Sequence, residues 1–404
     1  MSAETAARLR VLVCPHELIT GGSQINAIDL AARIRDRGHE VRVFAPPGPL
    51  QSRIDALGLQ YRPAPPMTGR ALSPRTVRAL RREIREFRPD IVHAYEHPPA
   101  VTSTAISQAT RHRSVITVLS MDVPDFLPVD VPLIVGTADL ARGQGARRGT
   151  VHLMEPPVDT AHDRPTDRRR ARADLGLGDD RFVISVVGRL SSEHEKARGV
   201  AEAIAALAAA PLPRAVTFVV AGSGDDEEGV RAAAARFSAV DFDVRLEGDV
   251  ADPRPVYAAA DLVIGMGSSA LRAMAHARPV VVQGPGGFWN LLSPDTIGLH
   301  LRQGFFGHGD SGGPSLAAIV SGVMADPASA EALGWFGRAV VEDRFAIDRA
   351  ASRLEQVYIA EARGPRAPGR RSAAYALWRY LLFRVALTHP RAHSAFRRVV
   401  HRHG

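Results

Sequence analysis

The sequence has one cysteine, Cys14, and one lysine, Lys196, in 404 residues. A single thiol excludes a disulfide within the chain and fits a reducing compartment. No stretch reaches 18 uninterrupted apolar residues, so no transmembrane helix is expected. The polar start over residues 1–10 lacks the apolar region of a signal peptide. We therefore expect a cytoplasmic protein.

Acidic residues are missing from residues 363–404, which contain ten arginines. Those ten charges exceed the chain's net charge of +8, so residues 1–362 carry −2. Nucleic-acid binding by this main body is disfavoured, because such binding requires a basic surface. The apolar fraction of 45% and the charged fraction of 23% are typical of a globular protein with an ample core.

Strand-like and helix-like segments alternate in two runs. The first run has strand patterns at 10–14, 41–45, 91–94, 115–119 and 133–136, and helix patterns at 24–37 and 74–87. The second has strand patterns at 182–187, 216–221, 244–246, 262–264 and 280–283, and helix patterns at 200–209, 227–237, 255–259 and 269–276. This alternation predicts an α/β protein with parallel sheets covered by helices on both faces.

A polar, Arg- and Asp-rich stretch over residues 160–180 separates the two runs and has the composition of a linker. Two doubly wound, Rossmann-like domains facing each other across a cleft are therefore expected. Ligands of such sheets bind beyond the carboxyl ends of the strands, so the cleft is the expected active site.

Glycine-containing turns follow the first strand of each run. Gly21-Gly22 precedes the first helix, where a backbone without Cβ admits a ligand and the helix N-terminus favours anions. An ordinary turn between a strand and a helix has the same composition. In the second run, Gly188-Arg189-Leu190 is followed by Lys196. A forked guanidinium and a compact ammonium suit a diphosphate, although a solvated basic loop remains the alternative.

A third motif is Ser268-Ser269, which follows Gly267 at the start of a predicted helix. A serine cap leaves backbone N–H groups pointing outward, and these would complete an anion cradle without a metal ion. Capping alone also accounts for the serines. Asp241-Phe242-Asp243 has the form of an Asp-x-Asp metal motif, but it begins a strand, so we interpret it as structural. No Cys/His cluster has metal-binding spacing, and no metal or cofactor is expected.

The order of these motifs resembles glycosyltransferase family 4. The resemblance spans about residues 10–362 and is carried by Gly21-Gly22, by Gly188-Arg189-Leu190 with Lys196, and by segments 90–94, 221–224, 246–250, 260–263, 271–275, 279–281 and 345–361. It implies the GT-B fold, with an N-terminal acceptor domain at 1–165 and a donor domain at 166–344. A crossover helix at 345–362 would pack back on the first domain, and residues 363–404 form a basic extension outside the resemblance.

The family implies retaining, metal-independent transfer of a sugar from a nucleotide diphosphate to a glycan, lipid-linked or small-molecule acceptor, as in polysaccharide biosynthesis. By resemblance, Arg189 and Lys196 neutralise the leaving diphosphate and Gly22 approaches it from the other domain. Asp249 and Val250 lie near the base, whose identity, uracil or guanine, stays open. Further donor contacts are expected from Gly21, Gly188, Gly222, Gly267, Ser268 and Ser269.

The chain lacks the two glutamates that the family places eight positions apart around its glycine-rich loop. The second falls on Arg272, which cannot accept hydrogen bonds from sugar hydroxyls. In a first helical turn an arginine also opposes the helix dipole, by about 0.3–1 kcal/mol. We expect Arg272 to contact the donor phosphates or a carboxylate on the donor sugar. The family histidine after the mid-domain strand is absent too, which leaves Asp122, Glu96 and His93 as acceptor-side candidates.

Two other functions stay open. The missing glutamates fit a non-catalytic, nucleotide- or glycan-binding relative that supports a partner. A twin-domain sugar-nucleotide epimerase is the other alternative and would require paired acid and base side chains in the cleft.

The basic extension contains a predicted helix at 373–387. It is too short and too charged to span a bilayer. It fits either attachment to an anionic surface at the inner face of a membrane or packing on the catalytic body.

Overall fold

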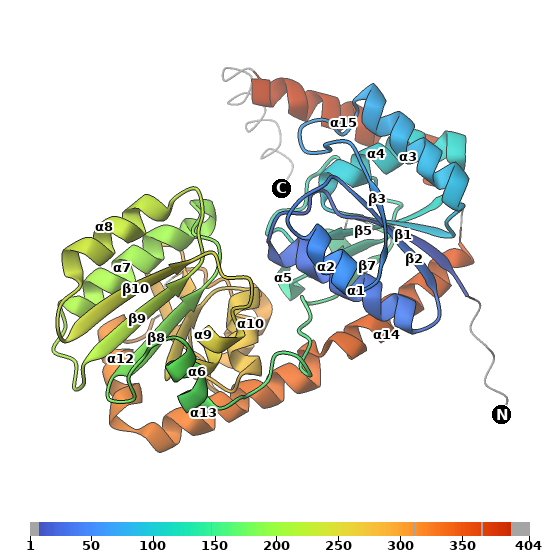
Figure 1. Cartoon of the computed structure of the whole chain (residues 1–404). Coiled ribbons are helices and arrows are strands. Elements are labelled where there is room, and N and C mark those ends of the chain that lie inside the picture. The colour runs from blue at the N-terminus through green and yellow to red at the C-terminus, as the bar shows by residue number, and fades with distance from the viewer. Residues whose placement is uncertain (1–7, 147, 310–311, 365–366, 389–404) are drawn as a thin grey trace. The chain divides into compact units, whose positions relative to one another are not determined.

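The computed structural model describes residues 8–146, 148–309, 312–364 and 367–388 (Figure 1). The described chain forms two compact units, each built around one sheet. Unit 1 holds the residues up to Gly136, residues 140–154 and those from Ala350 onward. Unit 2 holds residues 137–139 and 155–349. Both are α/β units with the expected Rossmann-like winding.

Unit 1 contains a seven-stranded, fully parallel sheet of order β3-β2-β1-β4-β5-β6-β7. Its strands are β1 (Arg10–Cys14), β2 (Glu40–Ala45), β3 (Gln60–Pro63), β4 (Ile91–Tyr95), β5 (Arg113–Val118), β6 (Leu133–Val135) and β7 (Val151–Leu153). The strand order reverses between β1 and β4, and ligands of such sheets bind at the carboxyl ends on either side of this point.

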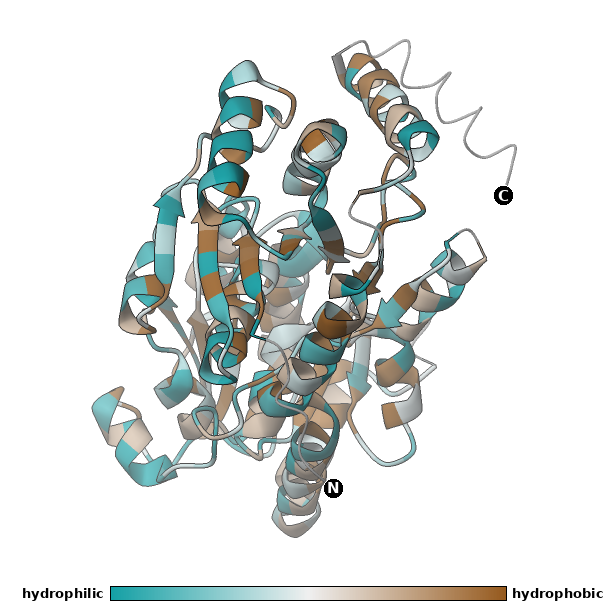
Figure 2. Cartoon of the chain, turned by 90° about the vertical axis from the view of Figure 1, so that its right-hand side faces the viewer, coloured by the Kyte–Doolittle hydropathy of each residue, from teal (hydrophilic) through white to brown (hydrophobic). Residues whose placement is uncertain are grey.

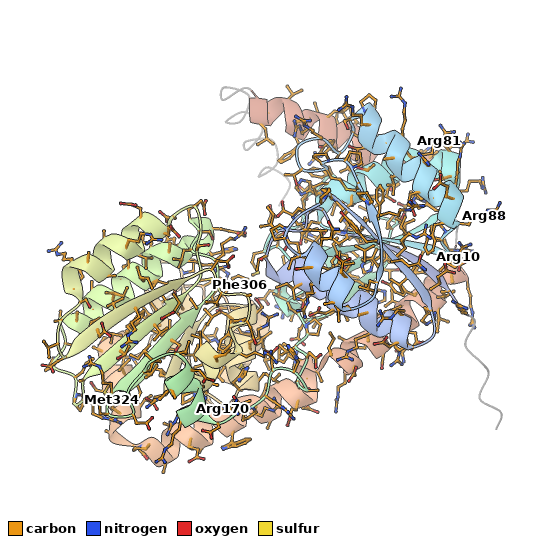
Figure 3. The ribbon with its side chains drawn as sticks, viewed as in Figure 1. Arg10, Arg81, Arg88, Arg170, Phe306 and Met324 are labelled. Atoms are coloured by element: carbon orange, nitrogen blue, oxygen red, sulfur yellow. The ribbon has the colours of Figure 1, made fainter. Side chains whose placement is uncertain are left out.

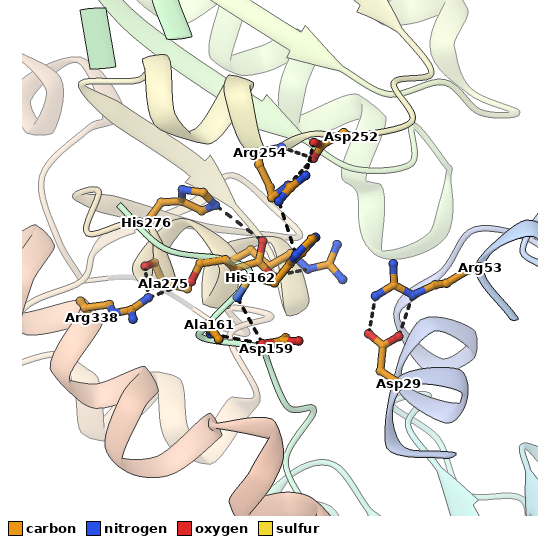
Figure 4. A network of polar contacts seen from close by, with 12 residues as sticks. Asp29, Arg53, Asp159, Ala161, His162, Asp252, Arg254, Ala275, His276 and Arg338 are labelled. Carbon is orange, nitrogen blue, oxygen red and sulfur yellow. Dashed lines mark hydrogen bonds and ion pairs between the residues drawn. The ribbon is translucent and has the colours of Figure 1, made fainter. Parts of the chain in front are cut away.

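The helices of unit 1 cover both sides of its sheet. They are α1 (Gly22–Asp36), α2 (Gln51–Ala56), α3 (Pro74–Phe87), α4 (His97–Thr110), most of α5 (Ala138–Gly145), most of α14 (Ile347–Ala362) and α15 (Arg370–Thr388). α3 packs beside α4, over a core that includes Leu80, Phe87 and Val92. On the surface, the guanidinium of Arg53 in α2 donates two hydrogen bonds, of 2.6 and 2.8 Å, to the carboxylate of Asp29 in α1 (Figure 4).

Unit 2 contains a six-stranded sheet of order β10-β9-β8-β11-β12-β13, parallel except for β13. Its strands are β8 (Phe182–Val187), β9 (Val216–Ala221), β10 (Phe242–Gly248), β11 (Leu262–Gly265), β12 (Val280–Gly284) and β13 (Phe288–Leu291). Its helices are α6 (Arg168–Asp174), α7 (Lys196–Ala208), α8 (Glu227–Phe237), α9 (Arg254–Ala259), α10 (Ser268–Ala275), α11 (Ile297–Gln303), α12 (Leu316–Ala325) and α13 (Pro327–Val340). Here the order reverses between β8 and β11.

The boundary between the units differs from the predicted positions 165 and 166. Residues 155–165 belong to unit 2, because Val158 pairs with Ala346 and Arg338 donates to the carbonyls of Thr160 and Asp163. In the polar network of Figure 4, Arg338 also donates to the carbonyl of Ala275, and Arg254 contacts His162. Part of the predicted linker is also folded. Arg172 of α6 is buried and pairs with Asp261 at 2.6 Å, a contact that composition alone does not reveal.

A five-residue π-helix, Val341–Phe345, follows α13 and leads to α14, the predicted crossover helix. Most of α14 belongs to unit 1, where Glu355 binds Arg37 and His39 at 2.6 and 3.0 Å. These contacts tie α14 to the region just after α1.

Helix α15 corresponds to the helix predicted in the basic extension and packs on α4 within unit 1. Its inner side joins the core through Tyr380, whose ring lies 5.2 Å from that of Phe126. Within the described residues no single helix is long and apolar enough to cross a membrane. α12 and the segment Pro327–Phe345 reach the required length and apolar composition only when taken together, and the chain bends by 107° between them.

Candidate functional site

Three loops at the carboxyl ends of β8, β9 and β10 lie against one another in unit 2. The N–H of Gly222 donates to the carbonyl of Gly248 at 2.6 Å, and the N–H of Gly188 donates to Ala221 at 3.0 Å. Gly222 has a φ of 150°, and a Cβ there would lie 1.9 Å from the Gly188 carbonyl oxygen. This position therefore requires glycine, and the predicted residues Gly188 and Gly222 are in direct contact.

Arg189 extends from these loops beside a cavity of about 350 Å³, whose lining is Arg189, Ser191, Ser192, Glu193 and Asp225. Its guanidinium is half-exposed and lies 3.3 Å from the Glu193 carboxylate. The hydroxyl of Ser191 is buried without a hydrogen-bond partner among the described residues. The cavity thus offers one partly neutralised cation and one unused hydroxyl to a ligand.

Lys196 is the first residue of α7, four positions earlier than the helix pattern predicts. The two residues before it, His194 and Glu195, both have positive φ angles of 55°, so the chain turns sharply into the helix. Burial lowers the pKa of Lys196; Glu193 opposes this shift and Arg189 adds to it. The side chain has no hydrogen bond or ion pair with any described residue, although Gln283 holds its carbonyl at 3.0 Å. An unpaired ammonium at a helix N-terminus concentrates positive potential there.

The start of α10 lies on the same side of unit 2. Phe306, labelled in Figure 3, packs its ring 5.0 Å from that of His194, and a Cβ on Gly267 would meet the Phe306 ring at 3.0 Å. Phe306 therefore connects the entrance of α7 with the loop before α10. The predicted Gly188–Lys196 and Gly267–Ser269 motifs are brought together through this ring.

The serine cap predicted for α10 is wrong in detail. Gly267, at φ 57° and ψ −125°, is the N-cap and has no side-chain cap bond. The hydroxyl of Ser269 instead accepts from the N–H of Met266 and donates to its carbonyl, both at 3.0 Å. The N–H and hydroxyl of Ser268 have no hydrogen bond with the described residues, so they are available to an anion.

Arg272 is paired internally with Asp163, at 3.9 Å, and His276 lies 3.6 Å from the same carboxylate. Burial alone would raise the pKa of Asp163, but His276 and Arg272 offset it and hold that pKa below its usual value. The predicted opposition to the helix dipole is also wrong. α10 has eight residues and Arg272 lies in its last turn, where a positive charge is favourable.

Asp249 and Val250 follow β10 directly, Asp249 exposed and Val250 packed beside the core formed by β8, β9 and α9. Because Gly248 bonds to Gly222, Asp249 lies next to the glycine loops. Asp241 and Asp243 stand at the opposite end of β10, and Asp243 pairs with Arg245 at 3.0 Å. Among the described residues no group of three acidic, Cys or His side chains has the geometry of a metal site.

In unit 1, Gly21 is the N-cap of α1 and Gly22 is its first residue. α1 has no acidic residue in its first turn and no side-chain cap bond, so no side chain of the helix itself caps its N-terminal amides. Around this turn, Gln24 donates to Glu17 at 3.0 Å and lies 3.4 Å from His16. Sequence reasoning missed these three side chains, because no spacing connects them before the loop is folded.

Glu96 follows β4 and is buried at the N-cap of α4. Its carboxylate accepts from the hydroxyls of Ser23 and Ser120, at 3.0 and 2.8 Å, and from the N–H groups of Leu119 and Ser120. With four donors, it joins the loops that follow β4 and β5 to the first turn of α1. This geometry gives Glu96 a positioning role in unit 1.

His93 is placed in the core, so the expected acceptor contact is not supported. It is fully buried, with one ring nitrogen 2.6 Å from the hydroxyl of Tyr358 and the other 2.7 Å from that of Thr117. Burial lowers the pKa of His93 to about 3, so the ring is neutral at pH 7. Asp122, in contrast, is exposed in the loop after β5 and stays an acceptor-side candidate.

Two family models match the chain, one in each unit. A model described as Glycosyltransferase Family 4 matches residues 20–126, and a model described as Glycosyl transferases group 1 matches residues 181–303. The second match contains the glycine loops, Arg189, Lys196 and α10.

Curated relatives match over much of the chain. A GDP-mannose-dependent alpha-mannosyltransferase of Mycobacterium tuberculosis is 27% identical over 326 residues, covering 71% of this chain and 82% of the relative. A D-inositol 3-phosphate glycosyltransferase of Nocardia farcinica is 25% identical over 342 residues, covering 70% of this chain and 74% of the relative. A relative with that same name from Segniliparus rotundus is 30% identical over 227 residues, covering 53% of this chain and only 48% of the relative.

Solved structures with a similar fold cover most of the chain. The Anabaena protein HepE in complex with UDP-glucose has a TM-score of 0.70 at 18% identity, covering 87% of this chain and all of HepE. Sucrose-phosphate synthase from Thermosynechococcus elongatus has a TM-score of 0.65 at 18% identity, covering 87% of this chain and 98% of the synthase. At these identities the likeness establishes the GT-B fold.

Proposed function

Because the chain belongs to glycosyltransferase family 4, we propose that it transfers a sugar from a nucleotide-diphosphate donor with retention and without a metal ion. The acceptor is a glycan, a lipid-linked saccharide or a small molecule. The observation that carries the proposal is the unpaired, half-buried Lys196 at the N-terminus of α7, beside Arg189 and the tightly packed glycine loops.

The proposed chemistry is charge neutralisation of the departing diphosphate. When the bond from the sugar to the phosphate breaks, negative charge develops on the leaving oxygen. A preorganised cation in a partly desolvated site stabilises that charge more strongly than water does. Lys196 supplies the point charge, Arg189 supplies the forked donor, and Ser268 supplies an unused N–H at the start of α10. These groups take the role that a metal ion has in other transferases.

Donor binding by these residues is supported by the kinds of relative that match. One relative is named for its dependence on GDP-mannose, and one structural neighbour was solved with UDP-glucose. Asp249 and Val250, beside the glycine loops, are the proposed neighbours of the base. We propose no choice between uracil and guanine, because neither side chain by itself distinguishes them.

The decisive experiment measures release of free nucleotide from a panel of UDP- and GDP-sugars, with binding followed by calorimetry. Losing one charged hydrogen bond is worth about 1.5–3 kcal/mol, so Lys196→Ala should weaken donor binding about 10- to 100-fold. Arg198→Ala is the matched control. It lies on the same helix but is exposed and paired with Glu195 and Glu202. Wild-type affinity in Lys196→Ala would refute the phosphate role.

A non-catalytic, donor-binding protein is the second candidate. It is favoured by Arg272, which stands where the family has a hydrogen-bond-accepting glutamate and is already engaged with Asp163. Binding of a nucleotide sugar without turnover, even with acceptor extracts present, would support this second candidate over transfer. Interconversion of sugar nucleotides without transfer would instead indicate an epimerase.

A further inference from the structure

Helix α15 is fixed on unit 1 by its inner side. The rings of Tyr380 and Phe383 lie 5.2 and 5.1 Å from that of Phe126. At the beginning of the helix, the Asp130 carboxylate accepts from the hydroxyl of Ser372 and from the N–H of Gly369, both at 2.6 Å. The helix therefore has a defined orientation, with one side committed to the core.

The outer side of α15 is apolar and exposed. Of the eleven exposed large hydrophobic side chains among the described residues, six lie on this helix. Five of them form what we call the α15 apolar face: Tyr375, Trp378, Leu381, Leu382 and Val385. Residues three, four and seven positions apart share one side of a helix, so these side chains form a continuous strip. Hydrophobic positions, in brown, interrupt the teal ones along this helix, which leads to the C label in Figure 2.

Positive charge accompanies this strip. α3 and α15 both pack on α4, so the three helices form one layer of unit 1. α3 exposes what we call the α3 arginine row: Arg75, Arg78, Arg81, Arg82, Arg85 and Arg88. Arg81 and Arg88 point away from the ribbon in Figure 3. Within the described residues Arg82 alone of the row forms an ion pair, with Glu86, the one exposed acid of the helix.

The sequence around α15 is also basic and supplies no acid of its own; within the described residues Asp125 pairs with Arg379 of this helix at 3.6 Å. Arg370 and Arg371 are exposed at its beginning, and residues 363–404 contain no acid. Two copies of this chain meeting through their α15 apolar faces would bring like charges together in a symmetric contact. An anionic lipid surface provides both an apolar interior and opposite charge, so it complements the strip and the arginines together.

We propose that α15 is an interfacial helix: its apolar face inserts at the headgroup level of an anionic bilayer, and the α3 arginine row contacts the lipid headgroups. Trp378 and Tyr375, amphipathic rings whose centroids lie 5.9 Å apart, suit the headgroup region. The proposal rests on α15 and α3 alone and is independent of the donor site.

Vesicle flotation of the full chain tests this proposal, with phosphatidylcholine vesicles that contain or lack phosphatidylglycerol. We expect binding to the anionic vesicles that decreases as salt is raised. The double variant Trp378→Ser/Leu381→Ser should lower the partition coefficient at least about ten-fold, since two large apolar side chains no longer leave water. Arg78→Glu/Arg81→Glu should weaken binding to anionic vesicles only.

Trp335→Ser is the matched control, because Trp335 of α13 is equally exposed but belongs to unit 2. It should leave flotation unchanged, and circular dichroism should show that every variant is folded. No flotation of the wild type would overturn the proposal, as would undiminished flotation of Trp378→Ser/Leu381→Ser. A solution dimer that this double variant dissociates would assign the apolar face to a second copy instead. The assay contains no nucleotide sugar, so its outcome is separate from that of the donor tests.

Discussion

The carboxylate of Glu96 accepts a hydrogen bond from the hydroxyl of Ser23 at 3.0 Å, which joins the end of β4 to the first turn of α1. Glu96 does so from a backbone conformation, φ 66° and ψ 174°, that is otherwise almost confined to glycine. The four hydrogen bonds to its carboxylate compensate for this strain. They hold together the loops at the point where the strand order of unit 1 reverses.

Replacing Glu96 by alanine or by glycine separates the network from the strain. Both changes leave the donors on Ser23 and Ser120 without their acceptor. Alanine also keeps a Cβ in the strained conformation, which costs on the order of 1–3 kcal/mol, whereas glycine relieves it. We expect both variants to be less stable than the wild type. The free energy of unfolding of Glu96→Ala should be about 1 kcal/mol lower than that of Glu96→Gly. Urea denaturation measures this difference, and an alanine variant as stable as the glycine variant would contradict it.

Gly222→Ala should disrupt the donor loops of unit 2. A Cβ at this residue would lie 1.9 Å from a backbone oxygen of Gly188, an atom that cannot move without shifting the loop. The φ of 150° adds strain for any residue with a side chain. We expect a loss of stability of at least about 2 kcal/mol and loss of nucleotide binding, measured by thermal unfolding with and without UDP or GDP.

Gly229→Ala is the control for that variant. Gly229 lies in α8, and a Cβ there meets no atom within 4 Å. Since alanine is the better helix former, this change should stabilise unit 2 by up to about 1 kcal/mol. If Gly222→Ala and Gly229→Ala changed the stability of unit 2 equally, the close approach of the Gly188 and Gly222 loops would not explain the effect of Gly222→Ala.

Regular elements with clear apolar periodicity could be predicted from the sequence to the residue. The predicted segments Pro74–Phe87, Phe182–Val187, Val216–Ala221 and Glu227–Phe237 coincide with α3, β8, β9 and α8. The two helices combine apolar periodicity with a recognisable start or stop, and the two strands are short, nearly continuous apolar runs. Ser73, for example, caps α3 by accepting from the N–H of Thr76.

Helix α4 was not predicted, for a physical reason. Its buried side includes Thr102, Ser103, Thr104 and Ser107, which obscure the apolar periodicity. Inside the helix the hydroxyls of Thr102, Thr104 and Ser107 donate to backbone carbonyls, whereas that of Ser103 pairs with His112 at 2.7 Å. A pattern that counts apolar residues cannot anticipate polar groups that become buried only once the helix has formed.

The candidate site could be predicted only in part. Glycine turns and basic residues that follow strands indicated the loops around Gly188 and Lys196, and the family resemblance indicated Gly222. The ion pair of Arg272 with Asp163 could not be predicted from the sequence, because Asp163 lies more than a hundred positions earlier in the chain and the two residues meet only in the tertiary fold. The core position of His93 was missed for the same reason, since Tyr358 comes from the distant α14.

Arg272→Ala and Asp163→Asn together test the role of the arginine. If Arg272 contacts donor phosphates or a sugar carboxylate, its loss should weaken donor binding about ten-fold or more, while Asp163→Asn should leave affinity unchanged or improve it by freeing the guanidinium. Calorimetric titration with a nucleotide sugar and with the free nucleotide gives both values. Equal donor affinity in Arg272→Ala and the wild type would reduce Arg272 to a structural partner of Asp163.

The buried His93 makes the stability of unit 1 depend on pH. Its pKa is about 3 in the folded protein, against an ordinary 6.5, because burial disfavours the charged ring. Between these values the unfolded chain binds a proton that the folded chain does not, so the free energy of unfolding falls as the pH drops. The titration of His93 alone should lower the free energy of unfolding by about 1–2 kcal/mol as the pH falls from 6.5 to 5. Urea denaturation across this range measures the slope.

His93→Gln should flatten that slope, because an amide can keep hydrogen bonds to Thr117 and Tyr358 but takes up no proton. The slope should not vanish, since burial also lowers the pKa of His112 in the same unit to about 4. His308→Gln, at an exposed histidine of unit 2, should leave the slope at its wild-type value. A wild-type slope in His93→Gln would mean that protonation of His93 does not limit the acid stability of unit 1.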